Sequence, residues 1–253
     1  MSSTEERAQQ IFGERAAFYT TSKCHSDPEV LGRVVEMARP TIDAHVLDVA
    51  TGTGHTAFAL APHVGDVIAT DITPQMLAEG EKLRNQRGIP NVVFQFADAH
   101  ELPYADEAFD IVACRRAAHH FSDIHTALAE MVRVLKPGGR LVIDDRSVAE
   151  DDFVDVTMNR LDWLHDESHV RQYRPSEWAR LLTDHGLTVE VVEPYTKHRP
   201  LSSLTNQVSA ANVAEIHSIM QNLSADERKK MNVEEKDGEL HQDHWYVMVG
   251  AVK

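Results

Sequence analysis

The stretch Val46–His55 constrains the fold of this chain more than any other part of the sequence. Apolar residues surround a single acid, Asp48, and a Gly-x-Gly turn from Gly52 to Gly54 then leads into a helical run. This order predicts a buried parallel strand, a tight bend without Cβ atoms in the way, and a helix. Open α/β sheets bind ligands at such strand ends, where backbone N–H groups are free. The stretch therefore predicts a ligand site, but a lone Gly-x-Gly is common and the rest of the chain must specify the ligand.

The rest of the chain repeats this alternation of short apolar segments and helical runs. Further strands are predicted at 67–70, 92–96, 109–114 and 140–144, and helices at 5–20, 28–38, 54–61, 73–87 and 123–135. Five apolar strands alternating with helices predict a parallel sheet with right-handed crossovers. A polar stretch at 150–175 interrupts this pattern. Beyond it we expect helix 176–185, strand 187–192, a helical region at 201–230, and a last strand at 244–252 that pairs antiparallel with 187–192.

Composition narrows the classes of function. A chain of 253 residues can bury a sizeable core in one domain, and its formal net charge of −15 disfavours DNA or RNA as a partner. Two cysteines, Cys24 and Cys114, make neither a disulfide framework nor a metal knuckle. The first ten residues are polar, and no stretch approaches the ~18 apolar residues of a membrane span. We therefore expect a cytoplasmic protein whose substrate is neither DNA nor RNA.

Two cofactors fit the glycine turn. Gly52, Gly54 and Ala57 match the pattern Gly-x-Gly-x-x-Gly/Ala, and Asp71, 19 residues after Gly52, ends the second strand. A carboxylate there can accept bonds from the hydroxyls of any ribose, so a nicotinamide dinucleotide and a sulfonium nucleoside are both possible. Asp48 distinguishes them, because an acid ahead of the glycines would repel a pyrophosphate but suits the ammonium of an amino acid.

Three further segments favour the sulfonium nucleoside. Asp98, followed by Ala99, ends the third strand, where it either accepts from an exocyclic adenine amine or caps the next turn. Phe109-Asp110 opens the fourth strand, and Leu135–Gly139 precedes the fifth. Together with the glycine turn, these residues resemble the class I S-adenosylmethionine-dependent methyltransferases over residues 45–145. Ala50 stands where that family usually has its first glycine, and we expect the change to be tolerated.

The runs Cys114–Phe121 and Asp166–Arg171 resemble the subgroup related to ubiquinone and menaquinone C-methyltransferases, which includes uncharacterised bacterial members. The resemblance implies an α/β, Rossmann-like fold whose seven-stranded, mostly parallel sheet has the order 3-2-1-4-5-7-6, with only the last strand antiparallel and helices on both faces. It implies a single domain over 1–253, with an N-terminal helical lid at 1–40, a cofactor-binding core at 45–145 and a substrate-side region at 146–253.

The resemblance also implies transfer of a methyl group from S-adenosylmethionine to a small acceptor, quinone-like or phenolic. Alternatives are an S-adenosylmethionine-binding protein without methyl transfer and an NAD-dependent oxidoreductase. Ile72 and Met76 are placed to sandwich adenine or to pack in the core, and Arg115 and Arg116 leave the fourth strand toward the cleft. The expected cofactor-binding residues are Asp48, Ala50, Gly52, Gly54, Asp71, Ile72, Met76, Asp98, Ala99 and Arg115.

Two histidines are candidates for a catalytic base. His119 and His120 follow the fourth strand, and histidine's unperturbed pKa of ~6.5 suits removal of a proton from an acceptor. The alternative is that one caps the following helix and the other packs. Their spacing from His125 matches no known metal site, so no metal is expected. Two other groups line either the site or ordinary surface: Phe18, Tyr19 and His25 as a lid, and His165, His169, Arg171, Tyr173 and Arg174 around the acceptor.

Overall fold

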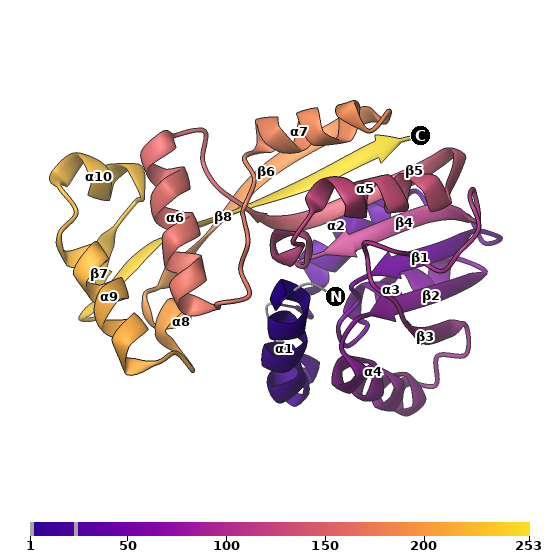
Figure 1. Cartoon of the computed structure of the whole chain (residues 1–253), viewed down its shortest axis with the longest axis horizontal. Coiled ribbons are helices and arrows are strands. Elements are labelled where there is room, and N and C mark those ends of the chain that lie inside the picture. Colours follow the sequence, from indigo (N-terminus) through magenta and orange to yellow (C-terminus); the bar gives the residue numbers. More distant parts are fainter. Residues whose placement is uncertain (1–2, 23–24) are drawn as a thin grey trace.

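A mixed sheet organises the computed structural model, which describes residues 3–22 and 25–253 (Figure 1). Cys24 lies outside the described residues. The strand order is β3-β2-β1-β4-β5-β8-β6. Strands β1 to β5 are parallel, and β8 is antiparallel to both of its neighbours, β5 and β6. The strand bounds are β1 His45–Val49, β2 Asp66–Asp71, β3 Val92–Phe96, β4 Phe109–Arg115, β5 Leu135–Ser147, β6 Thr188–Pro200 and β8 Glu239–Val252. The predicted order and the antiparallel last strand are confirmed.

The prediction of seven strands was wrong by one, because the described part of the sheet has eight. The additional strand, β7 (Glu234–Lys236), pairs with the start of β8. Its residues are all exposed and charged, so no apolar alternation marks it. The turn that follows does carry a signal, since Asp237 and Gly238 have φ values of 55° and 79°. An Asp-Gly pair with both φ values positive is typical of a two-residue hairpin turn.

Helices cover both faces of the sheet because alternate strand residues point to opposite sides. Val46 packs on one face with α2 (Pro28–Ala38) and α3 (His55–Leu60). Leu47 packs on the other face with α5 (Ile124–Val134) and α7 (Pro175–Asp184). Helix α4 (Pro74–Arg87) lies beside β3. The predicted two-sided architecture is confirmed.

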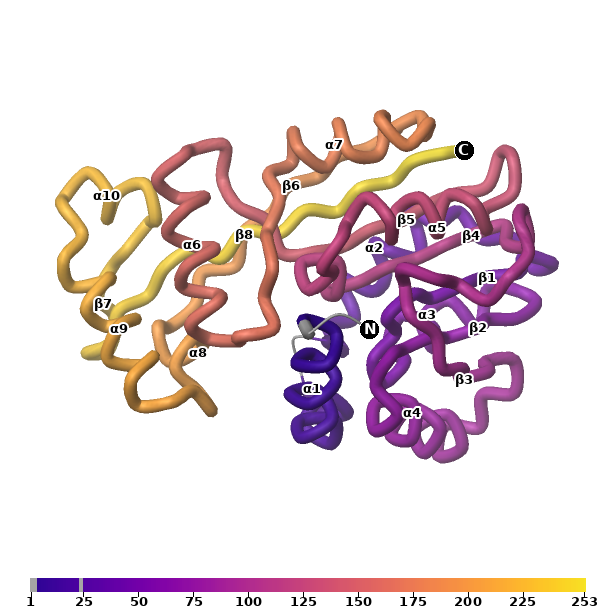
Figure 2. The backbone as a smooth tube through the Cα atoms, in the orientation of Figure 1, coloured from indigo at the N-terminus to yellow at the C-terminus, as the bar shows by residue number. Residues whose placement is uncertain are grey.

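A second lobe extends from the far ends of β6 and β8 (Figure 2). These strands have 13 and 14 residues, longer than predicted, and they run beyond the end of β5. The lobe contains α6 (Asp152–His165), α8 (Ser202–Thr205), α9 (Ala210–Gln221) and α10 (Ala225–Lys230). Helix α6 corrects the expectation of an irregular polar stretch at 150–175, because its apolar residues Val154, Met158 and Leu161 are spaced to form one buried face.

Helix α1 (Ser3–Thr21) lies across the carboxyl ends of the parallel strands, between the second lobe and α4 (Figure 1). The Gln9 side-chain amide donates to the Ile72 carbonyl at 2.5 Å, and the His55 ring nitrogen Nε2 lies 3.1 Å from the Tyr19 carbonyl. No helix among the described residues is long and apolar enough to span a membrane. The sheet edge beneath α1 is where a ligand can lie against the glycine turn.

Candidate active site

The glycine turn joins β1 to α3 through residues with left-handed backbone. Ala50, Gly52 and Gly54 have φ values of 53°, 56° and 90°. The two glycines have different functions in the turn. A Cβ on Gly54 would lie 2.5 Å from the Phe94 ring, whereas a Cβ on Gly52 would meet no heavy atom within 4 Å. Gly54 is therefore required by packing, and Gly52 keeps open the space in front of the turn.

Ala50 carries a conformational cost, because a positive φ disfavours any residue with a Cβ. Ala50→Gly is expected to raise the free energy of unfolding by roughly 0.5–1 kcal/mol, since relief of this strain exceeds the entropy that glycine adds to the unfolded chain. Urea denaturation of the purified variant measures the change. Gly52→Ala is the matched control, and its stability should change in the opposite direction. A loss of stability in Ala50→Gly would contradict this account of the turn.

Two buried carboxylates hold the turn in place. Asp71 Oδ2 accepts from the Gly52 N–H and Oδ1 from the Thr73 N–H, both at 2.8 Å. Asp48 Oδ2 accepts from the Thr51 hydroxyl at 2.5 Å and the Ala57 N–H at 3.0 Å. Burial raises the pKa of both acids, that of Asp48 to about 7. Each acid has acceptor capacity left for a ligand, because a carboxylate offers about four lone-pair sites.

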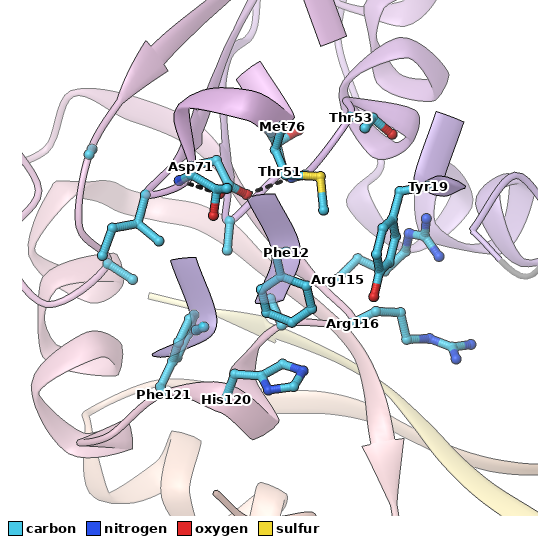
Figure 3. Close-up of a pocket in the computed structure, with 18 of the residues that line it drawn as sticks. Phe12, Tyr19, Thr51, Thr53, Asp71, Met76, Arg115, Arg116, His120 and Phe121 are labelled. Carbon is cyan, nitrogen blue, oxygen red and sulfur yellow. Dashed lines mark hydrogen bonds between the residues drawn. The ribbon is translucent and has the colours of Figure 1, made fainter. Parts of the chain in front are cut away.

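A cavity opens in front of this turn and is covered by α1. Figure 3 shows Asp71 and Met76 on one side of this first cavity and His120 and Phe121 on another, with Phe12 between them. Its wall brings together eight of the ten expected cofactor residues: Ala50, Gly52, Asp71, Ile72, Met76, Asp98, Ala99 and Arg115. The other two, Asp48 and Gly54, are not among the described residues that line this wall. The wall also includes residues that the sequence did not single out, among them Thr53, Thr73 and His100.

Some buried polar atoms around the turn lack a hydrogen-bond partner within residues 3–22 and 25–253. They include two donors, Thr53 Oγ1 and Arg115 Nη1, and one acceptor, Asp48 Oδ1. Two donors and an acidic acceptor complement an amino-acid zwitterion, whose carboxylate accepts and whose ammonium donates. The remaining Arg115 nitrogens are fixed, since Nε donates to the Thr56 hydroxyl at 2.8 Å and Nη2 to the His25 carbonyl at 2.6 Å.

Asp98 performs the capping function that the sequence left open. Its Oδ1 accepts from the His100 N–H at 2.9 Å and lies 2.7 Å from His100 Nδ1. Asp98 also lines the first cavity, so capping and ligand contact are compatible at this position. Contact with an adenine amine stays a prediction.

A second cavity of about 550 Å³ adjoins the first and is lined by residues of α1, of β5 and of the second lobe. Five residues line both cavities: Phe12, Tyr19, His25, Arg116 and His120. Phe18 and Tyr246 add further aromatic wall to the second cavity. The expected lid residues Phe18, Tyr19 and His25 are thus on cavity walls, although Phe18 is 56% exposed. Whether α1 opens and closes stays a prediction.

His119 forms a pair with Asp145 at the border of the second cavity. His119 Nδ1 lies 2.6 Å from Asp145 Oδ1, and the His119 N–H donates to Asp145 Oδ2 at 2.8 Å. Both residues are buried. Burial lowers the pKa of His119 well below its usual value and raises the pKa of Asp145 to about 6. A neutral imidazole whose Nδ1–H donates to Asp145 keeps Nε2 as an acceptor, the form a general base needs.

His120 has different partners. Its Nδ1 lies 3.1 Å from the Ser168 hydroxyl, which donates to Asp166 at 2.6 Å. Its ring meets Phe12 edge to face, with 4.9 Å between ring centroids. His120 therefore stands where the two cavities meet, held by residues of α1 and of the segment after α6. Catalytic roles for His119 and His120 stay predictions.

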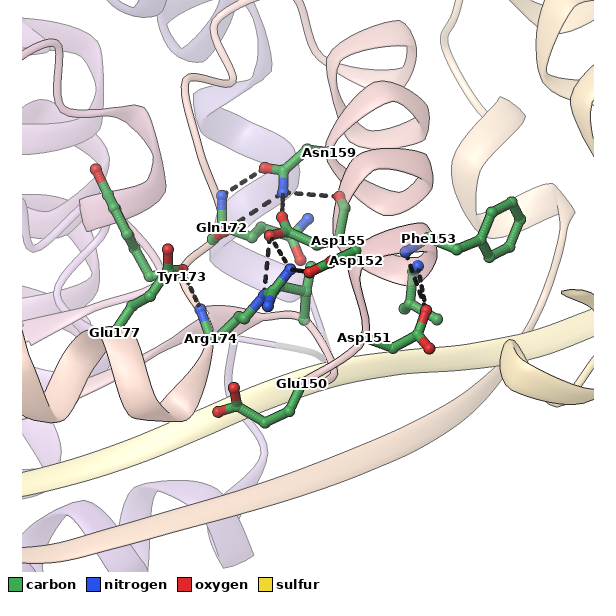
Figure 4. Close-up of polar contacts among 12 residues, drawn as sticks. Glu150, Asp151, Asp152, Phe153, Asp155, Asn159, Gln172, Tyr173, Arg174 and Glu177 are labelled. Atoms are coloured by element: carbon green, nitrogen blue, oxygen red, sulfur yellow. Dashed lines mark hydrogen bonds and ion pairs between the residues drawn. The ribbon is translucent and has the colours of Figure 1, made fainter.

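The segment after α6 is anchored by a polar network, and Figure 4 shows Asp155 at its centre. Arg171 Nη1 and Arg174 Nε donate to Asp155 at 2.9 and 3.0 Å, and Tyr173 packs edge to face on Trp178. Of the five residues expected around the acceptor, His165 and His169 line the second cavity. Arg171, Tyr173 and Arg174 do not line it. Arg171 pairs instead with Asp155 and Glu177, and Arg174 with Asp155.

In the part of the chain that the structure describes, no group of three or more His, Cys, Asp or Glu side chains is arranged to hold a metal ion. His125 stacks on His185, with 5.3 Å between their centroids.

The chain resembles known proteins in both sequence and structure. Residues 47–143 match the methyltransferase domain family. The chain is 37% identical to the uncharacterized methyltransferase YcgJ of Bacillus subtilis over 73% of each chain. It is 41% identical to a demethylmenaquinone methyltransferase of Thermus thermophilus, over 44% of this chain and 51% of that protein. The crystal structure of a putative methyltransferase from Bacillus halodurans superposes with a TM-score of 0.84 at 31% identity, covering 88% of this chain and 98% of the other.

Proposed function

Because the chain belongs to the class I S-adenosylmethionine-dependent methyltransferases, we propose that it methylates a ring bearing a hydroxyl group, phenolic or quinol-like, seated in the second cavity. S-adenosylmethionine is the methyl donor, which sets aside the NAD alternative. The His119–Asp145 pair carries the proposal, because a methyltransferase needs a base when its acceptor must lose a proton.

The polar atoms around the first cavity suit S-adenosylmethionine, the methyl donor. Asp71 would accept from the ribose hydroxyls, Thr53 Oγ1 and Arg115 Nη1 would donate to the methionine carboxylate, and Asp48 Oδ1 would face the ammonium. Ile72 and Met76 supply apolar contacts for adenine. The bound sulfonium makes its methyl group electrophilic, and the chain contributes alignment and exclusion of water.

The second cavity suits a planar acceptor. Phe12, Tyr19 and Tyr246 give it aromatic walls. His120 lines both cavities, and the ring of His119, which lines the second, has its centroid 4.0 Å from that of His120. An aromatic wall favours ring stacking at 4.5–7 Å between centroids, as a general property of such pairs. The partial similarity to a demethylmenaquinone methyltransferase agrees with a ring acceptor.

For transfer to the hydroxyl oxygen, the step would need one proton transfer: the acceptor's hydroxyl would give its proton to His119 Nε2, and the oxygen's electron pair would form the bond to the methyl carbon. The donor would supply the methyl group and keep the electron pair of its carbon–sulfur bond. For transfer to a ring carbon, that carbon would also have to lose its own proton, which the ring oxygen can take up. Asp145 then balances the positive charge on the imidazole ring. The products are the methylated ring and S-adenosylhomocysteine.

The acceptor class is tested by measuring S-adenosylhomocysteine release with matched panels of hydroquinones, phenols, amines and aliphatic acids. Release with hydroquinones or phenols, and with neither amines nor aliphatic acids, is the expected result. Turnover of amines or aliphatic acids alone would contradict the ring-hydroxyl proposal. If S-adenosylhomocysteine binds and no acceptor is methylated, a cofactor-binding protein without methyl transfer is the better account.

Asp71→Ala is expected to weaken binding of S-adenosylhomocysteine by about 1.5–3 kcal/mol, the loss of charge-assisted hydrogen bonds to the ribose. Isothermal titration calorimetry measures the change. Asp151→Ala is the matched control, because Asp151 also accepts from two backbone N–H groups, of Phe153 and Val154, but caps α6 in the second lobe. Unchanged affinity in Asp71→Ala would remove Asp71 from the cofactor site.

A further inference from the structure

We propose that the second cavity binds an anionic group, a carboxylate or a phosphate, carried by the methyl acceptor and held between Arg146 and Arg199. This inference rests on the proposed function, because it describes the same acceptor. Its basis is the charge of the cavity wall and the arrangement of guanidinium groups on it.

The wall of the second cavity is rich in arginine, although the chain as a whole has a net charge of −15. Arg15, Arg116, Arg146 and Arg199 line this cavity, whereas its acids are Asp162 and Asp166. Asp162 pairs with Arg146 and Asp166 with Arg15, while Arg116 pairs with Asp144, which does not line this cavity. On the wall itself the four arginines outnumber the two acids, and a concave surface with such an excess of one sign concentrates ligands of the opposite sign. In an acidic protein such a wall would attract an anion that the outer surface repels.

Arg146 provides a guanidinium group that is only partly used. Its Nη2 pairs with Asp162 at 2.5 Å and lies 3.2 Å from His244 Nδ1. Its Nε is buried and has no hydrogen-bond partner among the residues described. The planar guanidinium presents parallel N–H groups that match two oxygens of a carboxylate or phosphate. Both carboxylate oxygens of Asp162 are likewise buried without a hydrogen-bond partner in the part of the chain described, so the Nε–H of Arg146 is a donor that Asp162 and an anionic oxygen of the ligand can share.

Arg199 and His244 extend the same surface across the sheet. In the antiparallel register Arg199 pairs with Gln242 of β8, and Arg146 of β5 pairs with Tyr246. Residues two apart on a strand face the same side, so His244 lies between these two pairs on the face that carries both arginines. His244 is 1% exposed, and its Nε2 has no partner in the described part of the chain.

The pKa values of two histidines near the arginines indicate positively charged surroundings. Burial first, and then the charge of Arg146, lower the pKa of His165 and of His244. Neutral histidines leave the arginines as the fixed positive charges of the wall. An anion bound between Arg146 and Arg199 would offset this charge and raise both histidine pKa values.

One small molecule in this cavity can carry both the reacting hydroxyl and the anionic group. His119 and Arg146 both line this cavity, and the backbone N–H of Arg146 donates to Asp145 Oδ1, the oxygen that lies 2.6 Å from His119 Nδ1. A ring whose hydroxyl faces His119 would direct its anionic substituent toward the arginines of β5 and β6. The acceptor class is therefore a hydroxylated aromatic acid or aromatic phosphate.

The test uses the full chain loaded with S-adenosylhomocysteine and titrated calorimetrically with 4-hydroxybenzoate, phenyl phosphate and neutral 4-hydroxybenzamide at constant ionic strength. We expect at least one anionic probe to bind ten-fold or more tightly than the amide, and the stronger probe identifies carboxylate or phosphate. Arg146→Gln and Arg199→Gln should each abolish that preference. Arg160→Gln is the control, because Arg160 pairs with Glu215 on the exposed side of α6, away from the cavity.

Equal affinity for the anionic probes and the amide would overturn the proposal, as would a preference that survives Arg199→Gln. Arg199→Gln carries the test alone if Arg146→Gln fails to fold through loss of the partner of Asp162. Failure of methyl transfer with the anion preference intact would contradict the proposed function and leave the anion subsite standing. The two proposals are thus separated by one binding and one turnover measurement.

Discussion

Replacing His119 with asparagine is expected to lower kcat for methyl transfer by about 10²–10⁴-fold, the range for loss of a general base. Asparagine can still donate to Asp145, which lies 2.6 Å from His119 Nδ1, but it has no nitrogen that can take a proton from the acceptor. The measurement is single-turnover formation of S-adenosylhomocysteine with the best acceptor of the panel.

A control variant and a binding measurement distinguish loss of a base from general damage to the protein. His125→Asn, which removes a histidine stacked on His185 away from both cavities, should keep the wild-type rate. His119→Asn should also bind S-adenosylhomocysteine with wild-type affinity, because His119 lines only the second cavity. If His120→Asn loses the rate and His119→Asn does not, the base is His120 and the role of Asp145 is structural.

The same pair predicts a pH dependence. Burial raises the pKa of Asp145 to about 6, so the His119–Asp145 pair takes up a proton as the pH falls through that value. Proton uptake removes the free imidazole, and kcat/KM should therefore fall below about pH 6 and level off above it. A profile in His119→Asn with the same inflection as wild type would assign the titration to another group.

Asp48→Asn is expected to stabilise the protein without ligand at pH 8 by on the order of 2–4 kcal/mol, and to weaken cofactor binding. Burial raises the pKa of Asp48 from 3.8 to about 7. Because the folded value exceeds the unfolded one, the contribution of Asp48 to stability is complete below pH 3.8 and is lost as the pH rises through about 7. The neutral amide avoids that loss and can still accept from the Thr51 hydroxyl and the Ala57 N–H.

Thermal denaturation of wild type and Asp48→Asn between pH 5 and 8 measures this difference, which should grow with pH. The cofactor affinity of Asp48→Asn should fall by about 1.5–3 kcal/mol, because the ammonium of the donor loses a charged partner. Higher stability with lower affinity would mark Asp48 as an acid kept for binding at a cost to folding. Equal stability of the two proteins at pH 8, or unchanged affinity, would contradict this assignment.

The fold was predictable where its information is local. Each parallel strand is a short apolar run followed by a helix, and the chain order of such units determines most of the sheet. The lengths of β6 and β8 were not predictable, because their extensions are polar on one side and half exposed. Helix α6 was missed because its apolar positions lie among charged residues, and β7 because only Asp237-Gly238 marks it.

The candidate site, like the fold, was predictable from the sequence only in part. Gly52, Asp71 and Met76 lie at or just after strand ends. Because the carboxyl ends of parallel strands meet at one edge of the sheet, the sequence alone predicted that these residues lie close together. His119 could be proposed as a base, but its partner Asp145 is 26 residues away on the next strand. The wall formed by Arg146, Arg199 and His244 depends on the register of three strands, which no local pattern encodes.

The most direct test of the account is a crystal structure of the full chain with S-adenosylhomocysteine bound. We expect the ribose at Asp71 and the methionine carboxylate at Thr53 and Arg115. The sulfur should face the boundary of the two cavities near His120. The second cavity should remain open and continuous with the sulfur. A sulfur directed away from that boundary, or a ligand that fills both cavities, would contradict the assignment of donor and acceptor sites.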